Sequence, residues 1–190
     1  MAGRPVDHRR RAELLDAAVD HASEQVFSEL SWRSVAAALG VSSTTLVHHF
    51  GTKEQMLGAI LERLRERVVT ATTGTTAARP GLAAAARAVW TWSADPRQEP
   101  TFRLFFAVYG RAVQSPGSYA EFLDRIGEEW TAALCRAQGP DVDPATAASR
   151  ATLVVATIRG LLLDLLAGGD RARIERAAED FLAGLEDPDR

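Results

Sequence analysis

Small polar side chains gather in one short segment of this 190-residue chain. Ser43, Thr44 and Thr45 follow one another directly, and His48 comes about one helical turn later. Hydroxyl groups at the start of a helix can hydrogen-bond phosphates or base edges, and the helix dipole favours a phosphate at that end. The sole lysine of the chain, Lys53, adds a positive charge nearby. The chemistry that these residue types suit is recognition of phosphates and bases rather than catalysis.

Two short helices are needed to hold these side chains. Helical spacing of apolar residues predicts one helix over about 32–39, capped by Ser31, and a second over about 43–50, capped by Ser42. Gly40 lies between them, at a position suited to a positive φ. The residues able to form a core between the two helices are Val35, Ala36, Leu39, Val41, Leu46 and Phe50. With that core inside, the polar side chains of the second helix face outward, which is the pattern of a helix-turn-helix.

The rest of the chain is also expected to be helical. Apolar periodicity, capping signals and the placement of proline predict an all-α fold of about nine helices, and strand patterns are nearly absent. The fourth helix begins with Thr52 and Gln55 in the spacing of a capping box. The predicted helices cover about 8–25, 32–39, 43–50, 52–70, 81–94, 100–114, 118–138, 144–167 and 170–186. We expect residues 1–52 to form one domain and 53–190 another, with the helix over about 53–72 as the connector.

The total charge does not favour nucleic-acid binding. The chain has 22 basic and 25 acidic residues, a net charge of −3, whereas nucleic-acid-binding domains usually carry a basic excess. Residues 1–67 contain nine basic and nine acidic residues, so the placement of the basic groups would have to attract phosphates. The adjacent Arg9, Arg10 and Arg11 are either a solvated helix start or a phosphate-attracting group, and we favour the latter.

No segment of the sequence indicates a membrane, a metal or an enzyme. No apolar run reaches the roughly 18 residues that a membrane helix needs, and no apolar stretch of a signal peptide follows the basic N-terminus, so we expect a cytoplasmic protein. Four scattered histidines and the sole cysteine, Cys135, make no metal-ligand pattern. Residues 80–190 contain no phosphate loop and no nucleophile motif, so neither an enzymatic activity nor a cofactor is expected.

From about residue 14 to residue 57 the sequence resembles the DNA-binding domain of the tetracycline-repressor (TetR) family of bacterial regulators. The matching residues stand at the family's spacing: Leu15–Ala18, Phe27, Ser31, Val35, Ala36, Leu39–Ser42, Thr45, Leu46, His49, Phe50, Lys53, Glu54 and Leu57. The resemblance implies a homodimeric transcriptional regulator, usually a repressor that a small-molecule ligand releases from a palindromic operator in double-stranded DNA. The alternative is a helical protein-interaction module whose helix-turn-helix does not bind DNA.

The resemblance also implies which residues contact DNA. In the family the third helix enters the major groove, and the N-termini of the second and fourth helices hold the backbone. The contacts expected on this basis are Ser31, Arg33, Ser43, Thr44, Thr45, Val47, His48, His49 and Lys53. His49 is either such a contact or a packing residue. Val47 stands where the family commonly has a tyrosine; it lacks the hydroxyl that would contact a phosphate, and can instead meet a thymine methyl.

The resemblance places ligand binding and dimerisation in the remainder of the chain. The aromatic residues expected to line a ligand pocket, or else to form an ordinary bundle core, are Trp90, Phe102, Phe106, Tyr109 and Trp130. The last two helices are expected to form a four-helix bundle with those of a second subunit, through Ala156, Gly160, Leu163, Ile174 and Phe181. Arg159 and Asp164 either pair across that bundle or point into the ligand cavity.

Overall fold

Helices make up the regular secondary structure in the part of the chain that the computed structural model describes, namely residues 7–24, 31–73, 81–114 and 128–186. No strand occurs in these ranges, so the predicted all-α fold is confirmed. The packing divides the chain into two units, and each is described by itself. The first unit consists of residues 1–67 and 103–122, and the second of residues 68–102 and 123–190.

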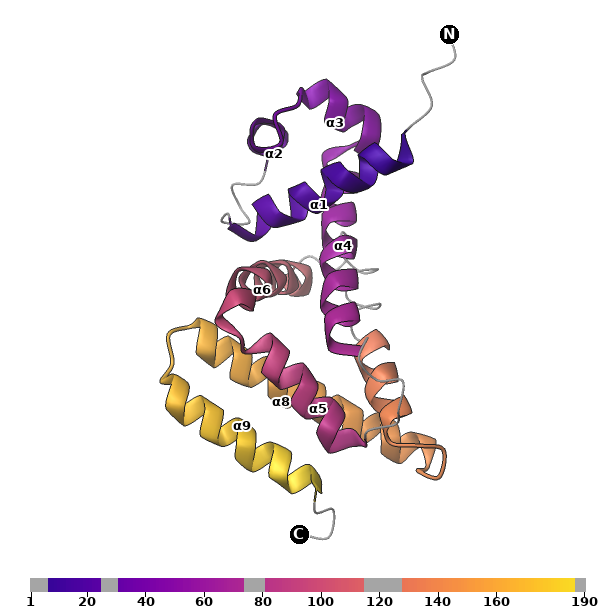
Figure 1. Cartoon of the computed structure of the whole chain (residues 1–190), viewed down its shortest axis with the longest axis vertical. Helices are drawn as coiled ribbons and strands as arrows, with labels where there is room; N and C mark the ends of the chain where they lie inside the picture. Colours follow the sequence, from indigo (N-terminus) through magenta and orange to yellow (C-terminus); the bar gives the residue numbers. More distant parts are fainter. Residues whose placement is uncertain (1–6, 25–30, 74–80, 115–127, 187–190) are drawn as a thin grey trace. The chain divides into compact units, whose positions relative to one another are not determined.

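The first unit contains the predicted helix-turn-helix (Figure 1). Its helices are α1 (His8–Glu24), α2 (Trp32–Ala38), α3 (Ser43–Phe50), the part of α4 (Lys53–Thr73) up to Arg67, and the part of α6 (Glu99–Gln114) from Arg103. The apolar faces of α1 to α4 form a buried core that includes Leu14, Ala18, Val19, Val35, Leu46, Phe50, Met56, Ile60 and Leu64. This core fixes how α3 is held, because Leu46 and Phe50 anchor it from one side.

Local hydrogen bonds begin the short helices of this unit where the sequence predicts. The Ser42 Oγ atom accepts the Thr45 N–H at 3.1 Å, which caps α3. Thr52 and Gln55 form the predicted capping box: the Gln55 N–H donates to the Thr52 hydroxyl at 3.2 Å, and the Thr52 N–H donates to the Gln55 side-chain oxygen at 2.8 Å. Gly40 has a φ of +63°, which permits the turn between α2 and α3.

The second unit is a helical bundle. Its main helices are α5 (Leu82–Ser93), a helix over 128–137, α8 (Pro144–Leu166) and α9 (Arg171–Glu186), and a short 3₁₀ helix, η2 (Pro96–Gln98), follows α5. α5, α8 and α9 pack against one another. Their core includes Ala86, Val89, Ala151, Val154, Ile158, Leu162, Ile174, Ala178 and Leu182. The Arg87 guanidinium on α5 also donates hydrogen bonds to the Glu179 carboxylate on α9, at 2.6 and 2.8 Å.

The helix ends agree with the sequence-based ranges to within a few residues. Of the helix predicted over 118–138, residues 118–127 lie outside the described part. The division into units falls after Arg67, whereas we placed a functional boundary at residue 52. Packing explains the later position, because the first turns of α4 bury Met56, Ile60 and Leu64 in the first unit. Among the described helices, none is long and apolar enough to cross a membrane.

Candidate nucleic-acid interface

The α2–turn–α3 segment presents two different faces of α3. Leu46 is completely buried and Phe50 is 5% exposed, so both point into the core. Ser43, Thr44, Val47 and His48 are exposed. Because residues three and four apart share one side of a helix, Thr44, Val47 and His48 form one outward face. We call these three residues the α3 outer face.

Some of the predicted contact residues have their polar groups engaged within the unit. The Ser31 hydroxyl accepts the Ser34 N–H at 3.1 Å and caps α2. The Thr45 hydroxyl lies 2.9 Å from the Ser42 Oγ atom, and the Thr45 side chain is only half-buried. These hydroxyls therefore first hold the helix starts in place, which positions the α3 outer face.

His49 has a more enclosed environment than His48. Its Nδ1 atom is buried and has no hydrogen-bond partner among the described residues. Burial lowers the pKa of His49, and the neighbouring His48, whose ring centroid is 5.2 Å away, lowers it further. Arg11 reaches the same place from α1: its Nε atom donates to the His49 carbonyl at 3.2 Å, and its guanidinium lies 5.2 Å from the Phe50 ring centroid. These contacts support a packing role for His49.

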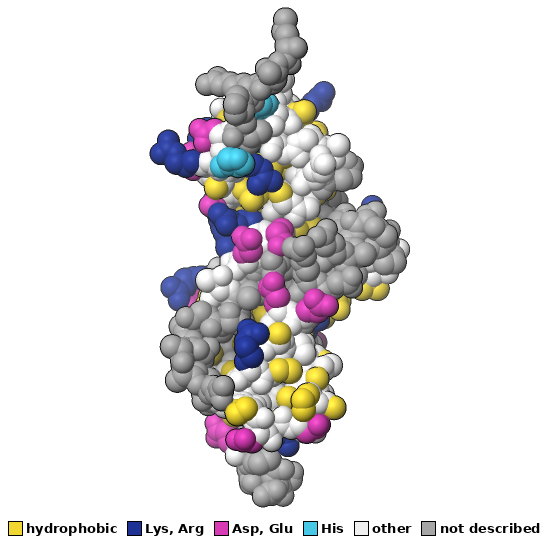
Figure 2. All heavy atoms as spheres, turned by 90° about the vertical axis from the view of Figure 1, so that its right-hand side faces the viewer, with side chains coloured by type: hydrophobic (Ala, Val, Ile, Leu, Met, Phe, Trp, Pro, Cys, Tyr) yellow, Lys and Arg dark blue, Asp and Glu magenta, His cyan; other side chains and the backbone are white. Residues whose placement is uncertain are grey.

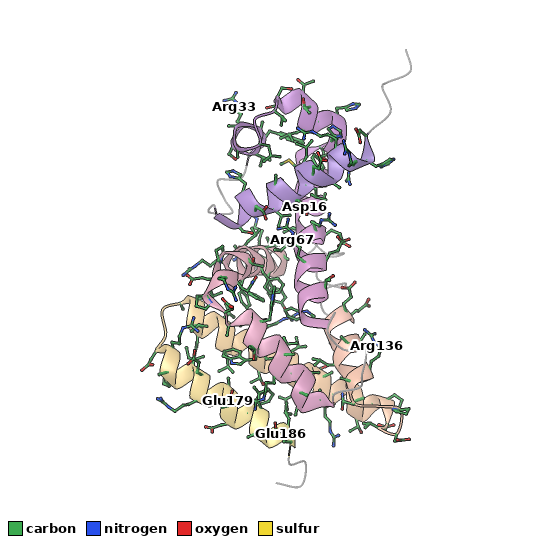
Figure 3. All side chains as sticks on the ribbon, viewed as in Figure 1. Asp16, Arg33, Arg67, Arg136, Glu179 and Glu186 are labelled. Atoms are coloured by element: carbon green, nitrogen blue, oxygen red, sulfur yellow. The ribbon has the colours of Figure 1, made fainter. Side chains whose placement is uncertain are left out.

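The basic residues near α3 differ in how far they are already paired within the unit. Arg33 on α2 is exposed and forms no ion pair with a described residue (Figure 3). Arg9 and Arg10 approach the Glu13 carboxylate at 3.8 and 3.2 Å. Lys53 is the first residue of α4, and its side chain lies outside the described part. On the one face that Figure 2 presents, basic and acidic side chains are both spread over the described surface.

Comparisons with known proteins decide the family. Residues 14–60 match the family model described as bacterial regulatory proteins, tetR family. The crystal structure of a transcriptional regulator from Rhodococcus sp. Rha1 superposes with a TM-score of 0.76 and 27% identity, covering 92% of this chain and 95% of that one. Over residues 14–60 this chain belongs to the tetR family of bacterial regulatory proteins.

Two further relatives have a stated role. The HTH-type transcriptional regulatory protein RaaS of Mycobacterium tuberculosis is 28% identical over 122 residues, which is 63% of this chain and 52% of RaaS, so the match spans about half of that relative. The multidrug binding protein EbrR, whose structure is complexed with imidazole, has a TM-score of 0.67 and 26% identity, covering 94% of this chain and 90% of EbrR. The family matched over residues 14–60 consists of bacterial regulatory proteins, and the solved structure from Rhodococcus sp. Rha1 is that of a transcriptional regulator.

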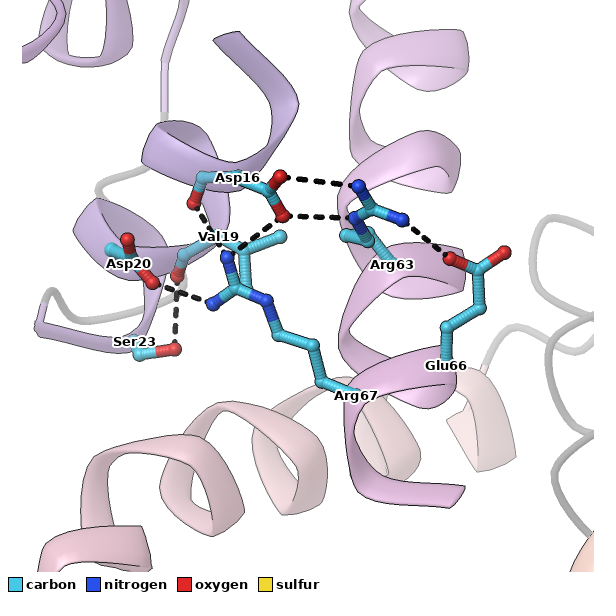
Figure 4. A network of polar contacts seen from close by, with 7 residues as sticks. All are labelled: Asp16, Val19, Asp20, Ser23, Arg63, Glu66 and Arg67. Atoms are coloured by element: carbon cyan, nitrogen blue, oxygen red, sulfur yellow. Dashed lines mark hydrogen bonds and ion pairs between the residues drawn. The ribbon is translucent and has the colours of Figure 1, made fainter. Parts of the chain in front are cut away.

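An ionic network joins α1 to α4 within the first unit of this TetR-family protein (Figure 4). The Asp16 carboxylate accepts two hydrogen bonds from the Arg63 guanidinium, at 2.9 and 3.1 Å, and a third from Arg67 at 2.9 Å. Arg67 also donates to the Asp16 carbonyl at 3.1 Å and pairs with Asp20. The Arg63 hydrogen bonds lower the pKa of the Asp16 carboxyl. We call Asp16, Asp20, Arg63 and Arg67 the α1–α4 clamp.

The second unit contains an apolar pocket. The pocket is partly open, and the space of about 530 Å³ between its walls includes open solvent. The lining residues come from α5, the helix over 128–137 and α8: Ala85, Ala88, Val89, Trp130, Ala133, Leu134, Ala137, Val154, Val155 and Ile158. None of them has an ionisable side chain. The Arg159 guanidinium carbon lies 5.4 Å from the Trp130 ring centroid, so a cation stands on the face of one lining residue.

The predicted ligand-binding aromatics are only partly gathered there. Trp130 lines the pocket. Trp90 and Phe102 are buried in the second unit but do not line it. Phe106 and Tyr109 belong to the first unit, where both rings lie against Phe105, with centroids 5.0 and 5.9 Å away. Our sequence reasoning missed the alanines of the lining. Their three- and four-residue spacing on facing helices was the available signal, because paired small side chains leave space between helices.

The predicted dimer residues differ in exposure. Ala156, Gly160 and Leu163 lie along one exposed face of α8, and Leu163 is 48% exposed. Leu153, at 57% exposed, extends that face. Phe181 is half-buried. The remaining residue, Ile174, is fully buried within its own unit, so it offers no surface to a second copy. Asp164 is exposed beside Leu163. In the described residues no cluster of His, Cys, Asp and Glu is arranged to hold a metal ion.

Proposed function

We propose that this TetR-family protein is a DNA-binding repressor that acts as a homodimer in the cytoplasm and is released from a palindromic operator by a small-molecule ligand. The observation that carries this proposal is the α3 outer face. A short helix is anchored from one side by Leu46 and Phe50, while Thr44, Val47 and His48 are exposed on the other. A helix-turn-helix built in this way places its second helix in the major groove.

In this proposal the residues around α3 make different kinds of contact. Thr44 and His48 supply hydrogen-bonding groups for base edges, while Arg33 and Lys53 supply charge for phosphates. Ser31, Ser43 and Thr45 lie at the helix starts, and His49 holds α3 against α1. Two copies of α3, related by the twofold axis of a dimer, would read two half-sites about one helical turn apart.

The exposed face of α8 is the proposed dimer surface. Ala156 and Gly160 present little side chain, which permits close approach of a second helix, and Leu153 and Leu163 supply apolar area. A Cβ atom added to Gly160 would meet nothing within 4 Å, so the small residue is not required by packing within the chain. A twofold axis would bring the same face of each subunit together.

The pocket of the second unit is the proposed ligand site. Its lining contains no ionisable side chain, and burying a charge without a partner costs several kcal/mol, so an uncharged, mainly apolar ligand is expected. The relative EbrR is a multidrug binding protein, which supports ligand binding in a chain of this fold. The ligand would release DNA to the extent that it binds the DNA-free state more tightly than the DNA-bound state.

Selection of the full-length protein on random duplex DNA tests this function. We expect enrichment of a palindrome, and log K that falls with log salt at a slope of about −5 if each subunit contacts about three phosphates. Thr44→Ala and His48→Ala should change the base preference, whereas Arg33→Ala should weaken binding to all DNA sequences alike. The absence of any enriched sequence, or a slope near zero, would favour the protein-interaction alternative.

The proposed ligand site is tested on the complex of the protein with the DNA recovered by selection. Two probe molecules with carbon chains of equal length are compared. Because the lining is apolar, 1-octanol should dissociate the DNA at a lower concentration than octanoate, followed by fluorescence anisotropy of labelled DNA. Ala133→Phe, which fills the pocket, should abolish the effect of 1-octanol and leave DNA binding intact. Tighter binding of octanoate would contradict the uncharged class and assign the carboxylate to Arg159 beside Trp130.

A further inference from the structure

The α3 outer face has an unusual composition for a solvent-facing surface. Among the side chains of α1 to α4 that the structure describes, Val47 is the one large hydrophobic group left exposed, at 48%. Its neighbours on the same face, Thr44 and His48, are polar. The buried positions of α3 are taken by Leu46 and Phe50, so packing within the unit gives no reason for an aliphatic residue at position 47.

The direction and stiffness of Val47 suit a contact with a base. In an α-helix each Cα–Cβ bond tilts toward the N-terminus, so the Val47 side chain leans toward the end of α3 that carries Ser43 and Thr44. In a helix-turn-helix that end contacts the base edges. A β-branched side chain in a helix has one strongly preferred rotamer, so its methyl groups are held in place before DNA arrives.

The major groove offers one apolar feature that matches these methyl groups. Thymine presents its 5-methyl group there beside the O4 acceptor, whereas the other bases present only hydrogen-bonding groups or a bare ring edge. We propose that Val47 is a specificity-determining residue that packs on the 5-methyl group of a thymine in each operator half-site. Thr44 and His48 then flank this contact with groups able to reach O4 or the neighbouring base. The inference rests on the proposed DNA-binding function and goes beyond it by naming the base.

The test removes only the methyl group. In the operator recovered by selection, each thymine is replaced in turn by deoxyuridine, and affinity is measured by fluorescence anisotropy. We expect one position in each half-site where the replacement weakens binding about fourfold, the effect of one buried methyl group. Replacement in both half-sites together should give about sixteenfold. Val47→Ala should bind the unmodified operator more weakly and respond little to deoxyuridine at that position.

A matched control uses a second exposed valine. Val113 on α6 is 64% exposed in the same unit, so Val113→Ala makes the same substitution away from α3. It should keep the full sensitivity to deoxyuridine. Helical content by circular dichroism should be the same for both variants, because each valine is exposed.

The outcomes separate this inference from the proposed function. If the protein binds a specific operator but no deoxyuridine replacement matters, or if Val47→Ala keeps the same sensitivity as the unchanged protein, the thymine contact is wrong and DNA binding stands. If the unchanged protein selects no DNA sequence at all, the proposed function itself fails and the thymine contact fails with it.

Discussion

At the scale of single residues, the two adjacent histidines of α3 have different environments. His48 is exposed on the α3 outer face, whereas His49 is half-buried, with its backbone held by Arg11. A neutral His49 suits this place, because its buried Nδ1 atom has no hydrogen-bond partner among the described residues. These contacts favour the packing alternative for His49, while His48 is the histidine exposed on the α3 outer face.

The protonation of His49 predicts an acid-sensitive fold. Desolvation lowers its pKa from 6.5, and His48, Arg10 and Arg11 act in the same direction, while Asp7 opposes them. The unfolded chain then binds the proton more readily than the folded one. Stability is therefore retained above about pH 6.5 and lost as the pH falls through the lowered pKa. His49→Gln should reduce this loss, measured as the urea midpoint between pH 7.5 and 5.5.

His48→Gln is the companion variant, because it removes the neighbouring imidazole that also lowers the pKa of His49. It should reduce the acid loss of the urea midpoint less than His49→Gln does, because burial, the larger cause of the lowered pKa, remains. An unaltered acid loss in His49→Gln would show that another group is responsible.

At the scale of elements, the α1–α4 clamp adds ion pairs to the apolar packing that holds the first part of α4 in the unit that carries α3. The division between the units follows Arg67, the last residue of the clamp. The clamp therefore fixes α4 to α1 up to that residue, and α4 continues to Thr73. Residues of both α4 and α6 belong to both units, so in the proposed function these two helices would connect ligand binding to α3.

The α1–α4 clamp predicts that replacing Asp16 lowers the free energy of unfolding more than replacing Asp20. Asp16 binds both arginines, whereas among the described residues Asp20 pairs with Arg67 and is 66% exposed. Asp16→Asn should lower the free energy of unfolding by about 1 kcal/mol at low salt, the upper end for partly exposed ion pairs. The loss should be smaller at high salt, since ions screen such pairs. Urea denaturation at two NaCl concentrations measures it, and a larger loss for Asp20→Asn would contradict this account.

The helix starts could be predicted from sequence because they depend on neighbours in the chain. The capping box of Thr52 and Gln55 and the positive φ of Gly40 are examples. The α1–α4 clamp could not be predicted from sequence, because Asp16 and Arg63 are 47 residues apart and meet only through the packing of two helices. Most of the pocket lining could not be predicted for the same reason, although Trp130 was named. Aromatic size suggested its lining, whereas facing alanines create the space, and which alanines face one another depends on the bundle.

At the scale of the whole molecule, the balance of charge bears on how tightly one copy could bind DNA. Nine basic and nine acidic residues in the first 67 positions leave no net charge, and some acidic groups are paired locally, as Asp16 is with two arginines. A single copy would therefore bind phosphates weakly. Joining two copies would double the number of phosphate and base contacts without a change in sequence, and effective concentration then favours the second half-site. In this account dimerisation is required for tight DNA binding.

The exposed face of α8 supplies the means to test that requirement. Leu163→Glu would place a charge in the proposed interface, and a twofold axis would place it there twice, so each dimer would bury two like charges. We expect the dimer dissociation constant to rise at least a hundredfold, measured by light scattering over a range of concentrations, and operator affinity to fall in parallel. Val113→Glu, at a valine exposed in the other unit, is the control and should leave both unchanged. A Leu163→Glu protein that stays dimeric would move the interface elsewhere. A monomer that binds the operator with full affinity would instead show that the contacts of one α3 helix suffice.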